Sequence, residues 1–308
     1  MVARRLFNRL LHSILVVLGI SAITFLLVYL AGDPAVLIAG EDATPAEVEA
    51  VREANGYNRP IFVQYFDWLW HAVQGDLGTS YRSGRPALEL ILGALPRTLL
   101  LIATALVLAS IIGIVIGVLA AVYRGSTFDR FVIAGSVFVQ SLPTFWLGIV
   151  LILVFSATLR LLPTSGFRGP EYLILPAVAL AVFQVGTFSR IVRSAMIEVL
   201  DSDFVRTARA KGASSRSIVF GHALRNAALP IITVIGLELG GLFGGAIVTE
   251  TVFGWPGISA LALSAIQSRD MAVVQAFVLV VGVLVVITNL VIDVVYARLD
   301  PRTRVGAR

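Results

Sequence analysis

Six apolar runs of about 20 residues each constrain this 308-residue chain more than any other feature. A helix of that length crosses the hydrocarbon core of a bilayer, which is about 30 Å thick. The runs cover residues 10–31, 98–123, 131–155, 173–191, 229–252 and 272–296. Soluble domains carry about 25% charged residues, whereas this chain carries 14%. We therefore expect an all-α polytopic membrane protein with six transmembrane helices.

The charges between these runs predict how the chain is oriented. Residues 32–96 hold nine acidic and four basic residues, whereas residues 190–225 hold seven basic and three acidic ones. Basic residues also precede the first run and follow the last one. Because cytoplasmic loops are enriched in Lys and Arg, we expect both termini in the cytoplasm and residues 32–96 outside. The net charge of +5 is thus explained by topology, and we expect no nucleic-acid partner.

The first run has a basic start, as secretory signal peptides do. A signal peptide has an apolar core of about 7–15 residues and ends in a small-residue cleavage site. Residues 10–31 form a longer run, and its Tyr-Leu-Ala end is a poor cleavage site. We expect an uncleaved first transmembrane helix.

The longest polar insert, residues 201–230, has the pattern of two helices joined by a glycine. Residues 207–211 favour a helix that ends at Gly212, and Ser214 or Ser215 can cap a second helix over 216–228. Pro230 is expected to begin the next span. Such an insert cannot lie in hydrocarbon, because a charge at the bilayer centre costs about 3 kcal/mol or more.

The ordered motifs TARAKG at 207–212 and HALRNAALP at 222–230 resemble the coupling ("EAA") loop of binding-protein-dependent ABC importer permeases. The spacing from Gly212 to Pro230 resembles that of the dipeptide/oligopeptide/nickel branch, which is longer than the spacing in other branches. Arg206 stands where other branches have the glutamate of the motif. The resemblance implies that this elbow docks on a separate ATPase; the alternative is a solvated basic loop that only fixes topology. The residues implied in coupling are Arg206, Thr207, Ala208, Arg209, Lys211, Gly212 and Arg225.

The outer segment also carries local signals. Thr44, Pro45 and Glu47 form a helix start with a capping box, and that helix should end near residues 55–56. A second helix should begin at Pro60 and end before Gly75, with an aromatic stripe suited to the membrane–water boundary. The motifs GDP at 32–34, GDLG at 75–78 and YRSG at 81–84 resemble B-type peptide permeases. This segment is either a cap packed on the bundle or a contact surface for the substrate-delivering protein.

Three spans carry residues of interest. In the second, small residues four apart, among them Gly113 and Gly117, predict close helix packing. In the third, the motif QSLPTFW at 140–146 resembles the family's Ser-Leu-Pro-x-Phe-Trp signature. Its proline breaks the helix, and Gln140, Ser141 and Thr144 either line a polar path or hydrogen-bond neighbouring helices.

The fifth span contains Glu238, and an intramembrane carboxylate suggests function. Family members commonly have a neutral amide at this place. Glu238 either sets the charge preference for substrate or is a solvated or partly protonated side chain. The motif ETVFGWPG at 250–257 resembles an outer re-entrant motif, in which Trp255 would lie at the interface. We assign Glu250, with Glu238, to the candidate substrate path.

Several chemistries are excluded by the residues present. A P-loop requires Gly-Lys-Ser/Thr, but the single lysine, Lys211, precedes a glycine. There is no cysteine, and the three histidines are far apart in sequence. We expect no enzyme, no catalytic residue, no bound metal and no cofactor in this chain; ATP and Mg²⁺ would bind to partner subunits. A self-contained channel or secondary transporter usually shows repeats or more spans, neither of which is evident.

The resemblance implies a type I ABC importer permease that imports dipeptides or oligopeptides across the bacterial inner membrane by alternating access. Glutathione, nickel chelates and haem are the alternative substrates. The implied partners are a second, similar permease, two ABC ATPase subunits (separate or fused) and an extracytoplasmic binding protein. We divide the chain into a transmembrane helix at 1–31, an outer segment with short helices at 32–96, and a core of five transmembrane helices at 97–308. The coupling loop within that core covers 196–228.

Overall fold

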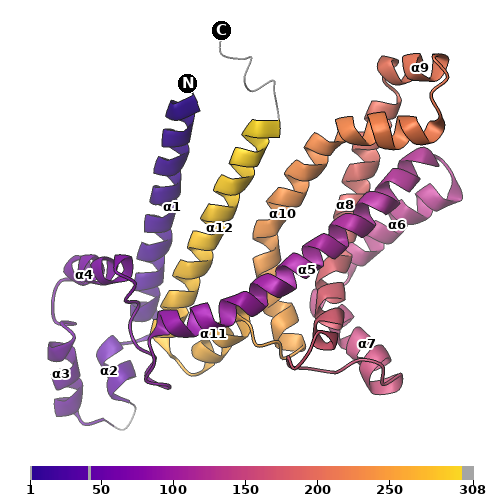
Figure 1. Cartoon of the computed structure of the whole chain (residues 1–308). Helices are drawn as coiled ribbons and strands as arrows, with labels where there is room; N and C mark the ends of the chain where they lie inside the picture. Colours follow the sequence, from indigo (N-terminus) through magenta and orange to yellow (C-terminus); the bar gives the residue numbers. More distant parts are fainter. Residues whose placement is uncertain (1, 41–42, 300–308) are drawn as a thin grey trace. The chain divides into compact units, whose positions relative to one another are not determined.

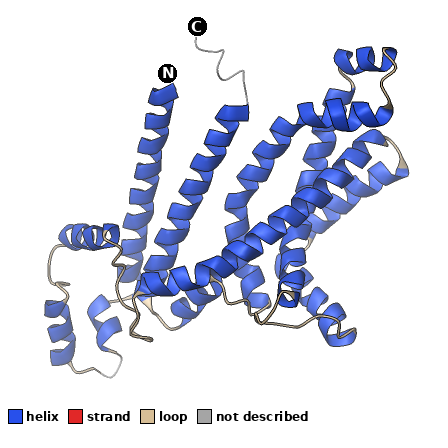
Figure 2. Ribbon diagram, in the orientation of Figure 1, coloured by secondary structure: helices blue, strands red, loops and turns tan. Residues whose placement is uncertain are grey.

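The structure, a computed structural model, describes residues 2–40 and 43–299. Glu41, Asp42 and the basic residues of 300–308, which entered the topology argument, lie outside the described residues. Within them every regular element is a helix (Figures 1 and 2). In chain order they are α1 Val2–Ala31, α2 Pro34–Ala39, α3 Pro45–Ala54, α4 Ile61–Val73, α5 Ala87–Val122, α6 Thr127–Ser141, α7 Thr144–Leu151, η1 Ile152–Thr158, α8 Glu171–Leu200, α9 Asp203–Ala210, η2 Ser217–Ala223, α10 Leu224–Val252, α11 Ile258–Gln267 and α12 Met271–Leu299.

The described helices confirm the all-α membrane architecture. Five are long and apolar enough to cross a bilayer, namely those in α1, α5, α8, α10 and α12. A sixth crossing results if α6 is counted together with α7 and η1. That pair is bent by 100° at its break, so the predicted single span over 131–155 is a broken one. Its cause is Pro143, which lacks an N–H and disfavours the helical conformation of Leu142, the residue before it.

The chain divides into two compact units. The first comprises residues 1–97 and 256–287, and the second residues 98–255 and 288–308.

In the first unit, α4 packs on α1 through aromatic and polar contacts. The Tyr65 hydroxyl lies 2.8 Å from that of Ser21, the Trp68 and Phe25 rings are 5.9 Å apart, and Tyr29 donates a hydrogen bond to Gln64. The opposite face of α4 exposes Phe62, Phe66, Trp70 and Val73. The residues of the predicted stripe are therefore divided between two faces: Tyr65 packs on α1, whereas these four form an exposed apolar face.

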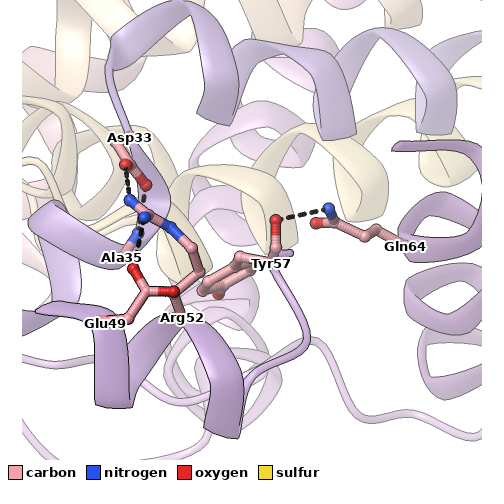
Figure 3. A network of polar contacts seen from close by, with 6 residues as sticks. All are labelled: Asp33, Ala35, Glu49, Arg52, Tyr57 and Gln64. Carbon is pink, nitrogen blue, oxygen red and sulfur yellow. Dashed lines mark hydrogen bonds and ion pairs between the residues drawn. The ribbon is translucent and has the colours of Figure 1, made fainter. Parts of the chain in front are cut away.

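The predicted start of α3 is confirmed. Thr44 caps the helix, Pro45 occupies its first turn, and Glu47 closes the capping box. The hydrogen bonds from the Thr44 backbone and hydroxyl lower the pKa of Glu47. Arg52 of the same helix contacts both Glu49 and Asp33, which ties α3 to the start of α2 (Figure 3).

Further contacts hold the segment between α3 and α5. The Gln64 side chain donates to the backbone carbonyl of Tyr57 at 3.1 Å (Figure 3), and burial raises the pKa of the Tyr57 phenol. Helix α4 ends at Val73, as predicted, before Gly75 with φ of +88°. The turn that follows is fastened to the start of α12, because the Ser80 hydroxyl donates to the buried Asp270 carboxylate at 2.5 Å.

In the second unit, α5 and α8 approach closely at two glycines. A Cβ atom added to Gly113 would lie 2.6 Å from the Cβ of Phe188, and one added to Gly117 would lie 2.6 Å from that of Val192. Real Cβ atoms do not approach so closely, so these positions admit only glycine without a backbone shift. The predicted packing role of this face is confirmed.

Replacing Gly117 by alanine is expected to destabilise the protein by about 1–3 kcal/mol, because overpacking forces the backbones of α5 and α8 apart. The added methyl would also lie 2.7 Å from the Ser189 carbonyl oxygen. The measurement is the midpoint of thermal aggregation of the purified protein in detergent. Gly135→Ala in α6, where the new atom meets nothing within 4 Å, serves as the control. An equal change in both variants would contradict the packing argument.

Candidate functional site

The polar insert forms a helix–turn–helix elbow at the ends of α8 and α10 (Figure 1). Helix α9 ends at Ala210, and Gly212 adopts a φ of +81°, which glycine tolerates and other residues rarely adopt. The amide of Ala213 bonds back to the carbonyl of Ala208 at 3.1 Å, which closes the helix end. The Ser214 hydroxyl accepts the Ser217 amide and caps the second helix. The predicted break at Gly212 and the predicted cap are both confirmed.

The second helix does not end where the sequence suggested. It continues through the π-helical segment η2 into α10 and reaches Val252 without interruption. Pro230 lies inside this helix, so the expectation that it begins a new element is wrong. Proline removes one backbone hydrogen bond, a loss that membrane helices tolerate when neighbouring groups compensate for it. The elbow and the fifth span are therefore one helix.

The elbow exposes a mixed basic and aromatic surface. Arg206, Thr207, Arg209, Lys211, Gly212 and Arg225 are exposed, and Ala208 is half-buried. Val205 and Ile218 are buried and anchor the two helices. Phe204 and Phe220 are 45% and 57% exposed. These two rings were not predicted as functional, although large apolar residues inside a polar insert are themselves a signal of a contact surface.

Two ion pairs connect the last part of α8, which leads into the elbow, to the start of α6 and the turn before it. Arg193 of α8 binds the Asp129 carboxylate with two nitrogens, one of them at 2.8 Å from Oδ2, and Asp129 is only 3% exposed. The Gly125 amide donates to the same carboxylate at 2.9 Å. An exposed pair joins Arg124 to Asp201 at 2.9 Å. No local pattern predicts these pairs, because 64 and 77 residues separate their members in the chain.

The broken third span presents its polar residues at the surface of this chain. Gln140, Ser141 and Thr144 flank the break and are exposed. The Gln140 amide donates to the Thr187 hydroxyl at 2.9 Å and accepts from Arg190 at 2.9 Å, whereas Ser141 bonds its own helix backbone. Gln140 thus makes the helix–helix hydrogen bonds that the second interpretation expected. Its exposure is also what a residue lining a polar path requires.

Arg190 lies inside α8 and not in a loop. It was counted with the basic residues of segment 190–225, but α8 continues to Leu200.

The two candidate glutamates lie in different surroundings. Glu238 is half-buried in α10, in a glycine-rich stretch. Glu250 is fully buried, and the Thr98 hydroxyl donates to its carboxylate at 2.5 Å.

The turn after Glu250 is buried as well. Trp255 is fully buried, with its ring 4.7 Å from that of Phe167, so its expected place at the membrane interface is wrong. The amide of Trp255 donates to the Glu250 carbonyl at 2.8 Å, and Gly254 has a φ of +55°. Among the described side chains, no group of three His, Asp or Glu residues could hold a metal ion.

Comparison with known proteins identifies the architecture. Residues 113–305 match the family described as binding-protein-dependent transport system inner membrane component, and residues 2–102 match the N-terminal model of that family. Among solved structures, two inward-facing crystal forms of the MetNI methionine ABC transporter share the fold, with TM-scores of 0.57 and 0.59 at 20% and 21% identity. Each covers 68% of this chain and 96% of the matched chain.

Curated relatives match over nearly the whole length. The probable D,D-dipeptide transport system permease protein DdpB of Escherichia coli is 41% identical, with 94% of each chain covered. The oligopeptide permease AppB of Bacillus subtilis is 40% identical, with 97% and 99% covered. The glutathione permease GsiC of Salmonella typhimurium is 41% identical, with 96% and 97% covered. The chain therefore belongs to the binding-protein-dependent transport system inner membrane components, which are multi-pass proteins of the cytoplasmic membrane.

Proposed function

We propose that this chain is the permease subunit of an ATP-driven, binding-protein-dependent importer of dipeptides or oligopeptides. The observation that carries the proposal is the elbow: an ordered helix–Gly212–helix with an exposed basic surface, continuous with a membrane-spanning helix. The substrate class comes from the relatives, which include a dipeptide permease and an oligopeptide permease. Glutathione, itself a small peptide, is the second candidate because relatives of equal identity are glutathione permeases.

In this proposal the elbow faces the cytoplasm and docks on an ATPase subunit that supplies the energy. Both termini lie on the same side, and residues 32–96 face outward, where a binding protein delivers substrate. The basic excess of residues 190–225 supports this orientation. Residues 97–308 form the permease core, and 196–228 the coupling loop. Arg206, Arg209 and Lys211 offer cations to acidic groups of the ATPase, while Phe204 and Phe220 offer apolar contacts.

A second, similar permease completes the translocation path, and two ATPase domains drive alternating access. ATP and Mg²⁺ bind to those domains and not to this chain. Gln140, Ser141, Thr144 and Glu238 line the path on this subunit, which their exposed or half-buried positions support. Glu250 is fully buried and accepts a hydrogen bond from Thr98 of α5, so in this proposal it holds α10 to α5 and does not line the path.

Reconstitution into liposomes tests the proposal. The complete complex is expected to accumulate a labelled dipeptide against its gradient when ATP is supplied on the elbow side and binding protein on the other side. Omission of the ATPase subunits should reduce uptake to background. Uphill accumulation by this chain with its permease partner alone would contradict the proposal, as would a complete complex that moves no peptide.

A further inference from the structure

Arg190 has no role in the proposed function, yet it lies within α8, one of the helices long and apolar enough to span a membrane. Its Nη2 atom donates to Gln140 Oε1 at 2.9 Å. Gln140 is eleven residues along α6 from Asp129, which corresponds to about 16 Å at 1.5 Å per residue. Asp129 lies in the first turn of α6, next to the polar loop that precedes it. The guanidinium therefore lies between α6 and α8, within the apolar helices and away from that loop.

The positive charge of Arg190 is not neutralised within the described part of the chain. Arginine stays protonated in proteins. Arg193, one helical turn away, binds the Asp129 carboxylate, but no described carboxylate lies within ion-pair distance of Arg190. Its hydrogen-bond acceptor is a neutral amide. A cation inside a membrane-spanning segment is costly and often marks a substrate or ion pathway.

The position of Arg190 beside a helix break makes the cation accessible. Helix α6 ends at Ser141, and α7 departs at 100° from it. Broken helices line the binding sites of many membrane transporters, because the break opens room for a substrate. Gln140 is exposed at this break, and Arg190 is only partly buried.

The guanidinium is also held in place before any ligand arrives. The Gln140 side chain that accepts from Arg190 is itself fixed, because its amide donates to Thr187 at 2.9 Å. Both Thr187 and Arg190 belong to α8, so the three side chains close a small network between α6 and α8. Fixed donors bind with a smaller loss of side-chain entropy.

We propose that Arg190 binds the C-terminal carboxylate of the peptide during its passage, with Gln140 as the residue that positions it. Guanidinium groups match the geometry of carboxylates and form charge-assisted hydrogen bonds with them. Every peptide with a free C-terminus offers such a group, whatever its side chains. The inference rests on the proposed peptide import and adds the residue that recognises the part common to all such substrates.

The test compares a dipeptide with its C-terminal amide, chosen so that the binding protein accepts both. Uptake is measured in proteoliposomes that contain the complete complex, with wild-type or Arg190→Gln permease. The wild-type and variant complexes use the same binding protein. Its own preference between the dipeptide and the amide therefore affects both complexes equally. Arg190→Gln is expected to lower uptake of the free dipeptide by about tenfold or more and to leave uptake of the amide unchanged.

Two further variants keep the inference falsifiable if Arg190→Gln does not assemble. Arg190→Lys keeps the charge but loses the planar guanidinium that can donate two parallel hydrogen bonds to a carboxylate. We therefore expect an intermediate preference for the free dipeptide. Gln140→Ala should lower that preference in the same direction, because the guanidinium loses its orientation. Arg124→Gln, which breaks an exposed ion pair, is the control and should leave the preference unchanged.

The outcomes separate the inference from the proposed function. If the Arg190 variants lower uptake of the dipeptide and of its amide equally, Arg190 has a structural role and the inference is wrong, although peptide import stands. If the wild-type complex takes up neither compound with ATP present, the proposed function itself is wrong.

Discussion

Replacing Gly212 by valine is expected to abolish ATP-driven uptake while the protein still inserts into the membrane. Gly212 has a φ of +81°, and a β-branched residue is a strong outlier in that region of backbone space. An added Cβ would meet no atom within 4 Å, so the effect comes from the backbone and not from a clash. The turn between α9 and η2 must change its conformation, and the surface proposed to contact the ATPase changes with it. Uptake and ATP hydrolysis are measured in proteoliposomes.

Gly166→Val provides a matched control for this variant. Gly166 has a φ of +92° and also no neighbour within 4 Å of an added Cβ, but it lies in the loop between η1 and α8 and not in the elbow. The two substitutions therefore impose the same kind of backbone strain. We expect Gly166→Val to retain uptake in proportion to the protein present. Normal uptake by Gly212→Val, or equal loss in both variants, would contradict the coupling role of the elbow.

Replacing Asp129 by alanine is expected to destabilise the protein by about 3–5 kcal/mol, because it leaves Arg193 without its partner in a largely buried position. The same change removes the acceptor of the Gly125 amide. The pair joins the start of α6 to α8, and α8 leads directly into the elbow. The midpoint of thermal aggregation of the purified protein measures the loss.

The control is the exposed pair between Arg124 and Asp201, whose side chains are both more than half exposed. Asp201→Ala is expected to cost at most about 1 kcal/mol, as exposed ion pairs do. The double variant Asp129→Ala/Arg193→Met should regain much of the lost stability, because it removes the unpaired charge as well. A double variant as unstable as Asp129→Ala alone would show that the charge is not the cause.

The sequence predicted the local features of this fold well, because those depend on neighbours in the chain. The capping box of Thr44 and Glu47, the end of α9 before Gly212, and the close packing at Gly117 each follow from a short pattern. The ordered motifs around the elbow also led to the family. Each of these signals depends on a few neighbouring residues and has a single structural interpretation.

The features that the sequence did not predict depend on contacts between distant residues. Residues 190–225 were counted as one charged segment, although α8 continues to Leu200 and the Arg190 side chain bonds to Gln140, 50 residues earlier in the chain. Aromatic residues suggest an interface, but Trp255 is buried against Phe167. Pro230 looks like a helix start in isolation, and only the structure shows the helix running through it.

The unbroken helix from the elbow into α10 has a mechanical consequence. Segment η2 and α10 are one continuous helix, but it contains a π-helical turn at Ser217–Ala223 and lacks a backbone hydrogen bond at Pro230. If the elbow docks on an ATPase as proposed, a displacement imposed near Ser217 passes along this backbone to Glu238 without crossing a loop. Helices bend at π-helical turns and at prolines, so these two places decide how much of that displacement reaches the span.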